Sequence, residues 1–227
     1  MNMFKIRTPL ILLVVFFLAG CQNLAKNESV PATTASWQKD RSFFSEQVDD
    51  LSLINHWKMS GKVGVVAPGI NQAANIIWDR ASDISSLKLY GPLGVGAVEI
   101  VYDDESATLS DSKGNEKSGD TPEELLFEVL GWQVPFNALR YWLRAVPQPD
   151  YAYDYRLNAE TQHLSELRQR GWHLYFSKYS LGGGDKKVLP KKIIAKKKLL
   201  VDGEEVEVTI RFIVRSLTDV ASLSDQL

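Results

Sequence analysis

The chain has few of the residues that usually carry catalysis or bind metals. Its 227 residues include one cysteine and three histidines, His56, His163 and His173. None of these histidines lies in a His-Glu-x-x-His motif or beside a pair of cysteines, so no zinc site is predicted. A Gly-x-Ser-x-Gly motif is missing, and the glycines of residues 91–96 lack dinucleotide-loop spacing. We therefore expect no enzymatic activity, no metal and no cofactor.

The chain also lacks a basic excess and an apolar run long enough to span a membrane. Its net charge of −2 gives no reason to expect a nucleic acid as partner. The apolar run at residues 9–18 is short, because a membrane-spanning helix takes about 20 apolar residues. It follows Lys5 and Arg7. The first 20 residues therefore have the basic start and short apolar centre of a secretory signal peptide.

The only cysteine directly follows this segment. Residues 18–21 read Leu-Ala-Gly-Cys, which resembles the lipobox of bacterial lipoproteins. The resemblance implies a signal peptide over residues 1–20 and a lipid anchor at Cys21, whereas an ordinary signal peptide with an incidental cysteine is the alternative. The next residue is Gln22 and not the aspartate that usually retains lipoproteins in the inner membrane. The resemblance therefore implies the periplasmic leaflet of the outer membrane.

The rest of the chain divides into a tether and a folded domain. Residues 21–36 are polar and show no apolar periodicity, so we expect a flexible lipidated tether. Residues 37–227 are long enough for one domain with a sizeable core. Apolar residues at helical spacing predict a helix within residues 37–54.

Alternating apolar and polar residues predict two series of strands separated by two helices. The first series is expected at residues 57–65, 75–79, 86–90, 95–102 and 107–110. A capping box at Thr121-Pro122-Glu123-Glu124 predicts one helix, and a second is expected after Val134-Pro135. The second series is expected at residues 151–157, 163–168, 172–179, 191–201 and 206–214. We predict a mainly β, α+β fold: an incomplete antiparallel barrel with the helices covering one opening.

A lysine-rich segment lies in the second series of strands. It begins at Lys186, ends at Lys198 and contains seven lysines. One interpretation is a charged strand pair whose edge is protected against aggregation. The other is a patch that meets anionic phospholipid or an acidic partner.

Short motifs recur in order along most of the chain. They are Trp57-x-x-x-Gly61, Ile76-Ile77-Trp78, Leu89-Tyr90-Gly91-Pro92-Leu93-Gly94, Gly131-Trp132-x-Val134-Pro135 and Leu139-Arg140-Tyr141-Trp142-Leu143. Together with the lipobox, this order resembles the LolB family of outer-membrane lipoproteins, which receive other lipoproteins from the periplasmic carrier LolA. The chain departs from the family in its long lysine-rich segment, in Phe212 where another aromatic often stands, and in its extension from Ser216 to Leu227.

The resemblance implies an apolar interior that accepts acyl chains. The implied partners are LolA, acylated lipoprotein cargo and outer-membrane phospholipid, and we expect a monomer. The tryptophans Trp57, Trp78, Trp132, Trp142 and Trp172 are, as a set, candidates for lining the cavity, although plain core packing is favoured for any single one. A structural envelope-assembly lipoprotein with a filled core is the alternative for the whole chain.

Leu93 has two possible roles. It lies between Pro92 and Gly94, at the tip of a predicted turn between two strands. Sequence alone favours a leucine that folds back over the edge of the core. The family resemblance favours an exposed membrane-insertion loop whose leucine dips into the outer membrane and helps to release cargo there.

Overall fold

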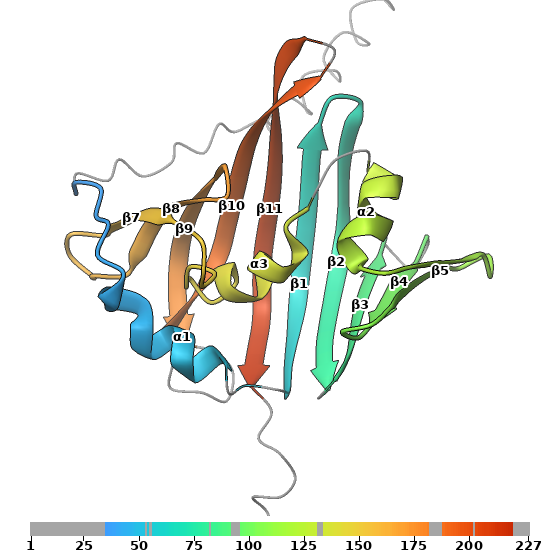
Figure 1. Cartoon of the computed structure of the whole chain (residues 1–227), viewed down its shortest axis with the longest axis horizontal. Coiled ribbons are helices and arrows are strands. Elements are labelled where there is room, and N and C mark those ends of the chain that lie inside the picture. The colour runs from blue at the N-terminus through green and yellow to red at the C-terminus, as the bar shows by residue number, and fades with distance from the viewer. Residues whose placement is uncertain are drawn as a thin grey trace, which may run out of the picture. The chain divides into compact units, whose positions relative to one another are not determined.

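The computed structural model describes residues 35–52, 54, 56–81, 83–91, 96–130, 134–181, 188–201 and 203–219. Their main feature is one antiparallel sheet of eleven strands (Figure 1). The strands are β1 (His56–Ala67), β2 (Ile70–Ala81), β3 (Ile84–Tyr90), β4 (Val98–Tyr102), β5 (Ala107–Asp111), β6 (Glu116–Gly119), β7 (Tyr153–Leu157), β8 (Leu164–Gln169), β9 (Trp172–Leu181), β10 (Val188–Val201) and β11 (Glu204–Asp219).

The sheet consists of two meanders joined by a pair of strands from opposite ends of the domain. Strands β1 to β6 pair in chain order, and so do β7 to β11. The long strand β1 pairs with β11, which brings the two meanders together in one sheet. Strands β6 and β7 are its two edges and do not pair with each other. The unclosed antiparallel sheet confirms the predicted incomplete barrel.

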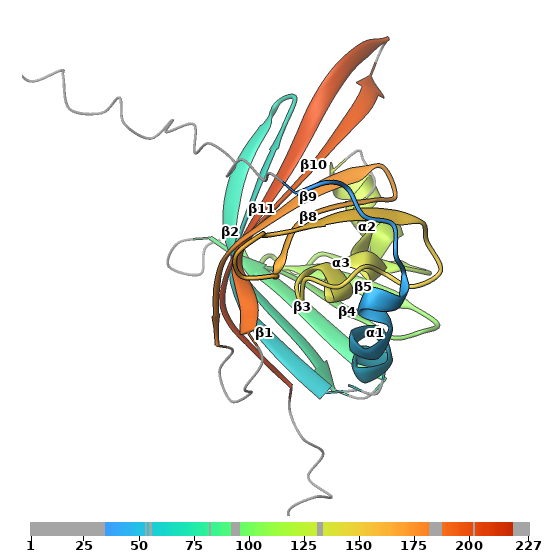
Figure 2. The same ribbon diagram turned by 90° about the vertical axis from the view of Figure 1, so that its left-hand side faces the viewer.

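Within the described residues, three α-helices lie on one face of this sheet (Figure 2). They are α1 (Ser45–Ser52), α2 (Pro122–Leu130) and α3 (Phe136–Trp142), and a short 3-10 turn, η2 (Ser42–Phe44), leads into α1. Helix α2 packs on β5 and β6. In the described part of the chain, no helix is both long and apolar enough to cross a membrane.

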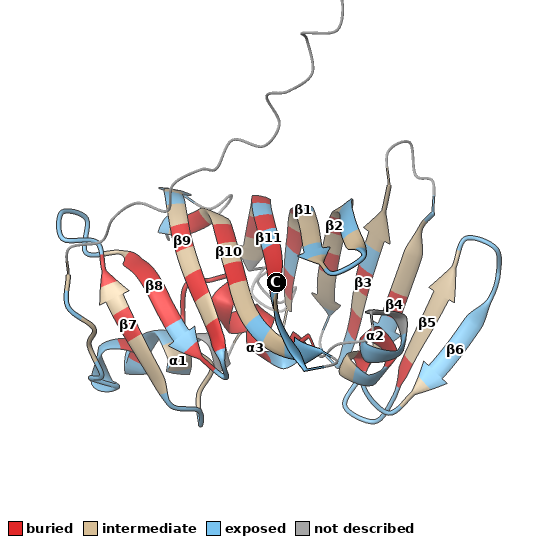
Figure 3. Ribbon diagram, turned by 90° about the horizontal axis from the view of Figure 1, so that it is seen from above, coloured by how far each residue is buried: buried red, intermediate tan, exposed pale blue. Residues whose placement is uncertain are grey.

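Burial alternates along the strands, as the sequence pattern predicts (Figure 3). In β1, Trp57 and Met59 are buried while Lys58 and Lys62 are exposed. The buried hydrophobic residues of the strands and helices together form the core. On the opposite face of the sheet, Lys58 and Lys62 are exposed, whereas Trp37 packs against Arg156 and Arg168.

The beginning of the domain follows the prediction in part. A helix was expected within residues 37–54, and α1 (Ser45–Ser52) lies there, although it occupies only the second half of that range. Gln38 instead pairs with the edge strand β7, through two backbone hydrogen bonds of 2.8 and 3.0 Å with Tyr155. Asp40 then accepts a hydrogen bond of 2.9 Å from the backbone N–H of Ser42, and hydrogen bonds from this serine lower the pKa of the Asp40 carboxyl. The first residues of this range are not helical because the edge of β7 offers backbone partners that periodicity cannot reveal.

The helix starts follow the sequence signals closely. Thr121 caps α2 by accepting a hydrogen bond of 3.2 Å from the backbone N–H of Glu124. The Glu124 carboxylate accepts a bond of 3.1 Å from the backbone of Asp120, one residue earlier than a capping box requires. Glu123 accepts a hydrogen bond of 2.9 Å from the backbone N–H of Asn137. This last bond ties the first turn of α2 to the start of α3.

Candidate functional site

An apolar cavity of about 270 Å³ lies between the sheet and the helices α2 and α3. Strands β1 to β5 and β11 form its wall. Its lining includes Val63, Val65, Ile70, Ala74, Ile76, Trp78, Leu87, Leu89, Val98, Ile100, Leu109, Leu126, Val134, Phe136, Leu139, Ile210 and Phe212. Polar side-chain groups in the lining come from Gln72, Tyr90 and Trp78. The cavity therefore suits an apolar ligand.

The strand register explains why a cavity forms at this place. Val63 lies opposite Ala74 on β2 and Phe212 on β11, so small side chains on β1 and β2 face inward there. Nearer the start of β1, Met59 lies opposite Trp78, and both are fully buried. Small inward residues leave space, whereas the larger ones fill it.

Aromatic rings close the space next to α3. The ring centroids of Trp78 and Phe136 lie 4.5 Å apart, and those of Tyr102 and Phe136 lie 5.2 Å apart. The indole N–H of Trp78 donates a hydrogen bond of 3.0 Å to the Tyr102 hydroxyl. Burial raises the pKa of this hydroxyl, so it stays protonated at neutral pH. The indole N–H of Trp78 and the hydroxyl of Tyr102 are therefore uncharged and partnered with each other.

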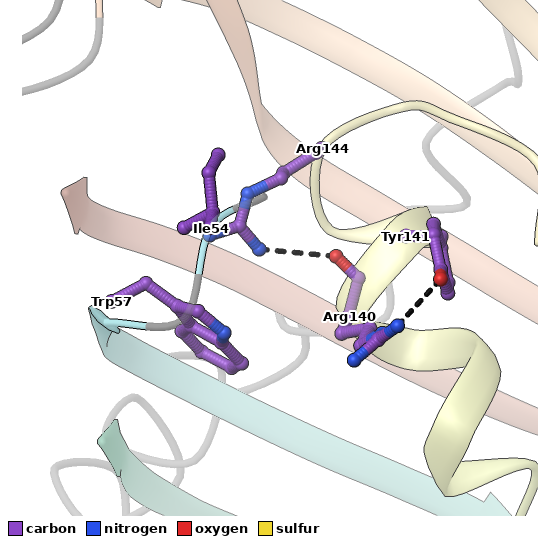
Figure 4. A pocket seen from close by; sticks show the side chains of 5 residues that line it. All are labelled: Ile54, Trp57, Arg140, Tyr141 and Arg144. Carbon is purple, nitrogen blue, oxygen red and sulfur yellow. Dashed lines mark hydrogen bonds between the residues drawn. The ribbon is translucent and has the colours of Figure 1, made fainter. Parts of the chain in front are cut away.

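A second, much smaller pocket lies on the other side of α3 (Figure 4). It has about 10 Å³, roughly the space of one water molecule. Arg144 donates a hydrogen bond of 3.1 Å to the Arg140 carbonyl, and its guanidinium lies 4.9 Å from the centre of the Trp57 ring. Arg140 donates a bond of 2.5 Å to the Tyr141 hydroxyl. These contacts hold the end of α3 against β1.

The structure separates the tryptophans that the sequence analysis grouped. Trp78 lines the apolar cavity, whereas Trp57 lines the small second pocket. Trp142 and Trp172 are buried beside each other, with ring centroids 6.4 Å apart, and neither lines the cavity. Trp142 turns away because its indole N–H donates a hydrogen bond of 2.9 Å to Gln169 on β8. Whether any of them contacts an acyl chain stays a prediction.

Several predicted residues lie outside the described part of the chain. They are Cys21, Pro92, Leu93, Gly94 and Trp132. Their roles stay predictions. The described strands β3 and β4 flank the loop that contains Leu93, and these strands pair from Leu89–Val98 to Ser85–Tyr102.

The aliphatic lining was not singled out from the sequence. Val63, Val65, Ile210 and Phe212 lie on the same faces of β1 and β11 as the buried core. Because these residues alternate with more polar neighbours, the sequence could have predicted that they face the core. Whether an inward residue meets a void or another side chain depends on strand register, which alternation does not supply.

The lysine-rich segment is partly neutralised by acidic partners on β11. Lys196 bonds to Glu207 at 2.8 Å and Lys198 to Glu205 at 2.7 Å. The Lys196 ammonium lowers the pKa of Glu207, and the Glu205 carboxylate raises that of Lys198. These cross-strand pairs are the geometry expected for a charged strand pair. Lys186 and Lys187 lie outside the described residues.

The family model for "Outer membrane lipoprotein LolB" matches residues 55–216. The chain belongs to the LolB family. The LolB match includes every residue that lines the apolar cavity. The cavity is therefore part of the LolB domain and not of the segments around it.

Curated LolB proteins match most of the chain. The outer-membrane lipoprotein LolB of Francisella tularensis subsp. novicida is 31% identical over 80% of this chain and 83% of its own length. That of Stutzerimonas stutzeri is 30% identical over 87% of this chain and 89% of its own length. That of Pseudomonas fluorescens is 30% identical over 86% and 89%. Among solved structures, a LolA superfamily protein from Nitrosomonas europaea aligns with a TM-score of 0.44 at 10% identity, over 83% of this chain and 96% of that one.

Proposed function

We propose that this protein is an outer-membrane acceptor of lipoproteins. It takes them from the periplasmic carrier LolA, holds their acyl chains in the apolar cavity and inserts them into the outer membrane. Membership of the LolB family supports the role in lipoprotein localisation. The observation that carries the acyl-binding step is the 270 Å³ cavity with its almost wholly aliphatic and aromatic lining.

The physical need for such a cavity follows from the cargo. Each exposed methylene of an acyl chain costs about 0.8 kcal/mol in water, so a lipoprotein cannot cross the periplasm uncovered. Transfer needs no nucleotide if the acceptor binds the acyl chains more tightly than the carrier does. A difference of about 1.4 kcal/mol in binding free energy gives a tenfold preference for the acceptor. The bilayer is then the final and deepest apolar environment.

The size of the cavity implies that it widens during binding. Its volume of about 270 Å³ is just below the roughly 300–1,000 Å³ typical of ligand pockets. Helices α2 and α3 cover it, and the hydrogen bond between Glu123 and Asn137 ties them together. We infer that the two helices move as a unit when several chains enter.

The anchor and the loop around Leu93 would act at the membrane. A signal peptide over residues 1–20, a lipid on Cys21 and a tether over residues 21–36 would hold the domain of residues 37–227 at the periplasmic leaflet as a monomer. Pro92 and Gly94 would present Leu93 to the bilayer. In the Leu93→Glu variant, acceptance of cargo should survive while delivery to liposomes falls. Unchanged delivery would assign Leu93 to the core.

Two neighbouring valines provide a matched test of the cavity. Val65 lines the cavity, whereas Val66 is exposed on the opposite face of the same strand. Placing a polar amide against apolar walls costs on the order of 1–3 kcal/mol. We therefore expect Val65→Asn to weaken binding of a dansyl-labelled fatty acid about tenfold, and Val66→Asn to leave it unchanged. The measurement is fluorescence titration of the full chain carrying Cys21→Ala.

The same titration separates this function from its alternative. A structural lipoprotein with a filled core would bind no fatty acid in any variant. Equal affinity in both valine variants would place the ligand outside the cavity. In cells, depletion of the protein should cause lipoproteins to accumulate on LolA, and normal delivery after depletion would contradict the acceptor role.

A further inference from the structure

Strands β10 and β11 extend beyond their neighbours as a two-stranded ribbon (Figure 1). The pairing of β9 with β10 ends at Lys196, and that of β1 with β11 ends at Thr209. Beyond these points, residues 197–201 pair with residues 204–208. Gly203 adopts a φ of 84° in the two-residue turn between them. We call residues 197–208 the β10–β11 ribbon.

The two faces of this ribbon differ in character. On the outer face, Lys198 lies directly opposite Glu207 and forms a salt bridge of 2.7 Å with the diagonal neighbour Glu205. On the inner face, the next cross-strand pair is Leu199 and Val206, both half-buried. Val208 follows on the inner face and is 1% exposed. Lys197, opposite Val208, also lies on the inner face, where its ammonium is 5.7 Å from the centre of the Trp172 ring, and Leu200 lies on the outer face opposite Glu205. The inner face is therefore the apolar one around Leu199 and Val206.

The apolar inner face continues the wall of the cavity. Phe212 and Ile210 line the cavity, and Val208 and Val206 follow at intervals of two residues on the same face of β11. Figure 2 shows the ribbon leaning toward the side of the sheet on which the helices lie. Beyond Leu199 and Val206 on the inner face, Val201 is 45% exposed and lies opposite Glu204. An apolar surface thus runs from inside the cavity along the inner face to Leu199 and Val206.

We propose that the inner face of the β10–β11 ribbon is a track for the acyl chains of the cargo as they enter and leave the cavity. This proposal rests on the proposed function, since it takes the cavity to be the acyl site. The track keeps a chain in contact with apolar side chains after its end has left the cavity, which limits its exposure to water. Leu199 and Val206, which are both partly exposed, are the residues that contact the chain.

The charges of the ribbon argue against anionic lipid as the occupant. Between residues 196 and 207, three lysines stand against four acidic residues. Two of the lysines already pair with Glu205 and Glu207. Attraction to an anionic bilayer needs a net positive charge, which this segment lacks. Continuity with the cavity favours the acyl chain instead.

Photo-crosslinking tests the proposal directly. A benzophenone amino acid is placed at Val206 on the inner face or at the neighbouring Glu205 on the outer face of the full-length lipidated protein. LolA loaded with a lipoprotein carrying radiolabelled palmitate is then added. We expect labelled acyl chains to crosslink at position 206 and not at position 205. Equal labelling, no labelling, or crosslinks at position 206 to bilayer phospholipid without cargo would each overturn the proposal.

A pair of double variants tests what the track contributes to transfer. The inner pair is Leu199→Ser with Val206→Ser, and the outer control is Lys198→Ser with Glu205→Ser. We expect the inner pair to slow transfer from LolA about fivefold, equivalent to about 1 kcal/mol, while the control transfers at the wild-type rate. Circular dichroism checks that both double variants fold. If the inner double variant does not fold, the photo-crosslinking experiment alone tests the proposal.

Binding of the dansyl-labelled fatty acid separates the two proposals. If the wild-type chain does not bind it, the proposed function fails. If the wild-type chain and the inner pair bind it equally but the inner pair transfers cargo at the wild-type rate, the track fails and the cavity stands. If the inner pair binds the fatty acid equally but transfers more slowly, the ribbon acts in transfer and not in storage.

Discussion

The rings of Trp78 and Phe136 lie 4.5 Å apart between centroids and join β2 to α3 at the cavity. Phe136 is 2% exposed and also packs edge-on against Tyr102. One side chain of α3 thus contacts aromatic rings from β2 and β4. This contact fixes the first turn of the helix that covers the cavity.

The loss of this ring should destabilise the domain strongly. Phe136→Ala removes a buried aromatic side chain next to an existing void, so we expect the free energy of unfolding to fall by about 3–5 kcal/mol. Phe127 on α2 is 47% exposed and provides the control, since Phe127→Ala should cost less than about 1 kcal/mol. Urea denaturation measures both. Equal losses would show that α3 is not held by the Phe136 contact.

Two glycines of β1 should respond very differently to a methyl group. A β-carbon at Gly61 would lie 2.3 Å from the carbonyl oxygen of Ile213, whereas one at Gly64 would meet nothing closer than 3.8 Å. The register between β1 and β11 shifts between Ser60 and Gly61, so the backbones approach closely there. We expect Gly61→Ala to lower the free energy of unfolding by about 1–3 kcal/mol and Gly64→Ala to change it by less than about 0.5 kcal/mol. Equally stable variants would contradict the close approach.

The sequence predicted the strands and the helix pair well because their signals are local. Alternation in residues 57–65 and 86–90 became β1 and β3, with Leu87 and Leu89 on the inner face. The hairpin expected at Asp202-Gly203 formed, with Val201 and Glu204 as its terminal pair. Each of these features depends on neighbours within a few residues.

Long-range features were not predictable in the same way. Strand β6 (Glu116–Gly119) was missed because its sequence, Glu-Lys-Ser-Gly, has no apolar alternation and pairs only as an edge of the sheet. The pairing of β1 with β11 was not stated, although it joins the two meanders and places Phe212 beside Val63. The composition shows a high aromatic content, but it does not show which tryptophan lines the cavity. The pairing of β1 with β11 joins residues more than a hundred positions apart, which no local pattern reveals.

His173 should make the stability of the domain depend on pH. Burial lowers the pKa of this imidazole from its usual value of 6.5, more than the hydrogen bond and charge of Glu166 raise it. The nearby charges are Glu166, Arg156 and Arg168, with Lys196 opposite His173 on β10. An unfolded chain then binds a proton at a pH where the folded chain does not, so stability falls as the pH drops below about 6.5.

The His173→Gln variant isolates this contribution. It should retain the pH dependence due to the rest of the chain but lose the part due to His173. The difference in unfolding free energy between wild type and variant should therefore shrink or reverse from about pH 8 to about pH 5. Urea denaturation at a series of pH values measures it. Two parallel curves would show that His173 binds protons equally in both states.

Trp37 should fix the point at which the N-terminal segment meets the sheet. The guanidinium of Arg168 lies 3.9 Å from the centre of its ring and that of Arg156 lies 4.4 Å from it. The adjacent Gln38 pairs with Tyr155 at the β7 edge. Because stacking on two cations is worth about 1–2 kcal/mol, Trp37→Ala should lower stability by that amount and speed hydrogen exchange at the amides of Gln38 and Tyr155. Lys39→Ala, at an exposed neighbour, should change neither. If exchange at both amides stays slow in Trp37→Ala, backbone pairing alone holds the segment, and the tether would leave the domain at β7 without help from the indole.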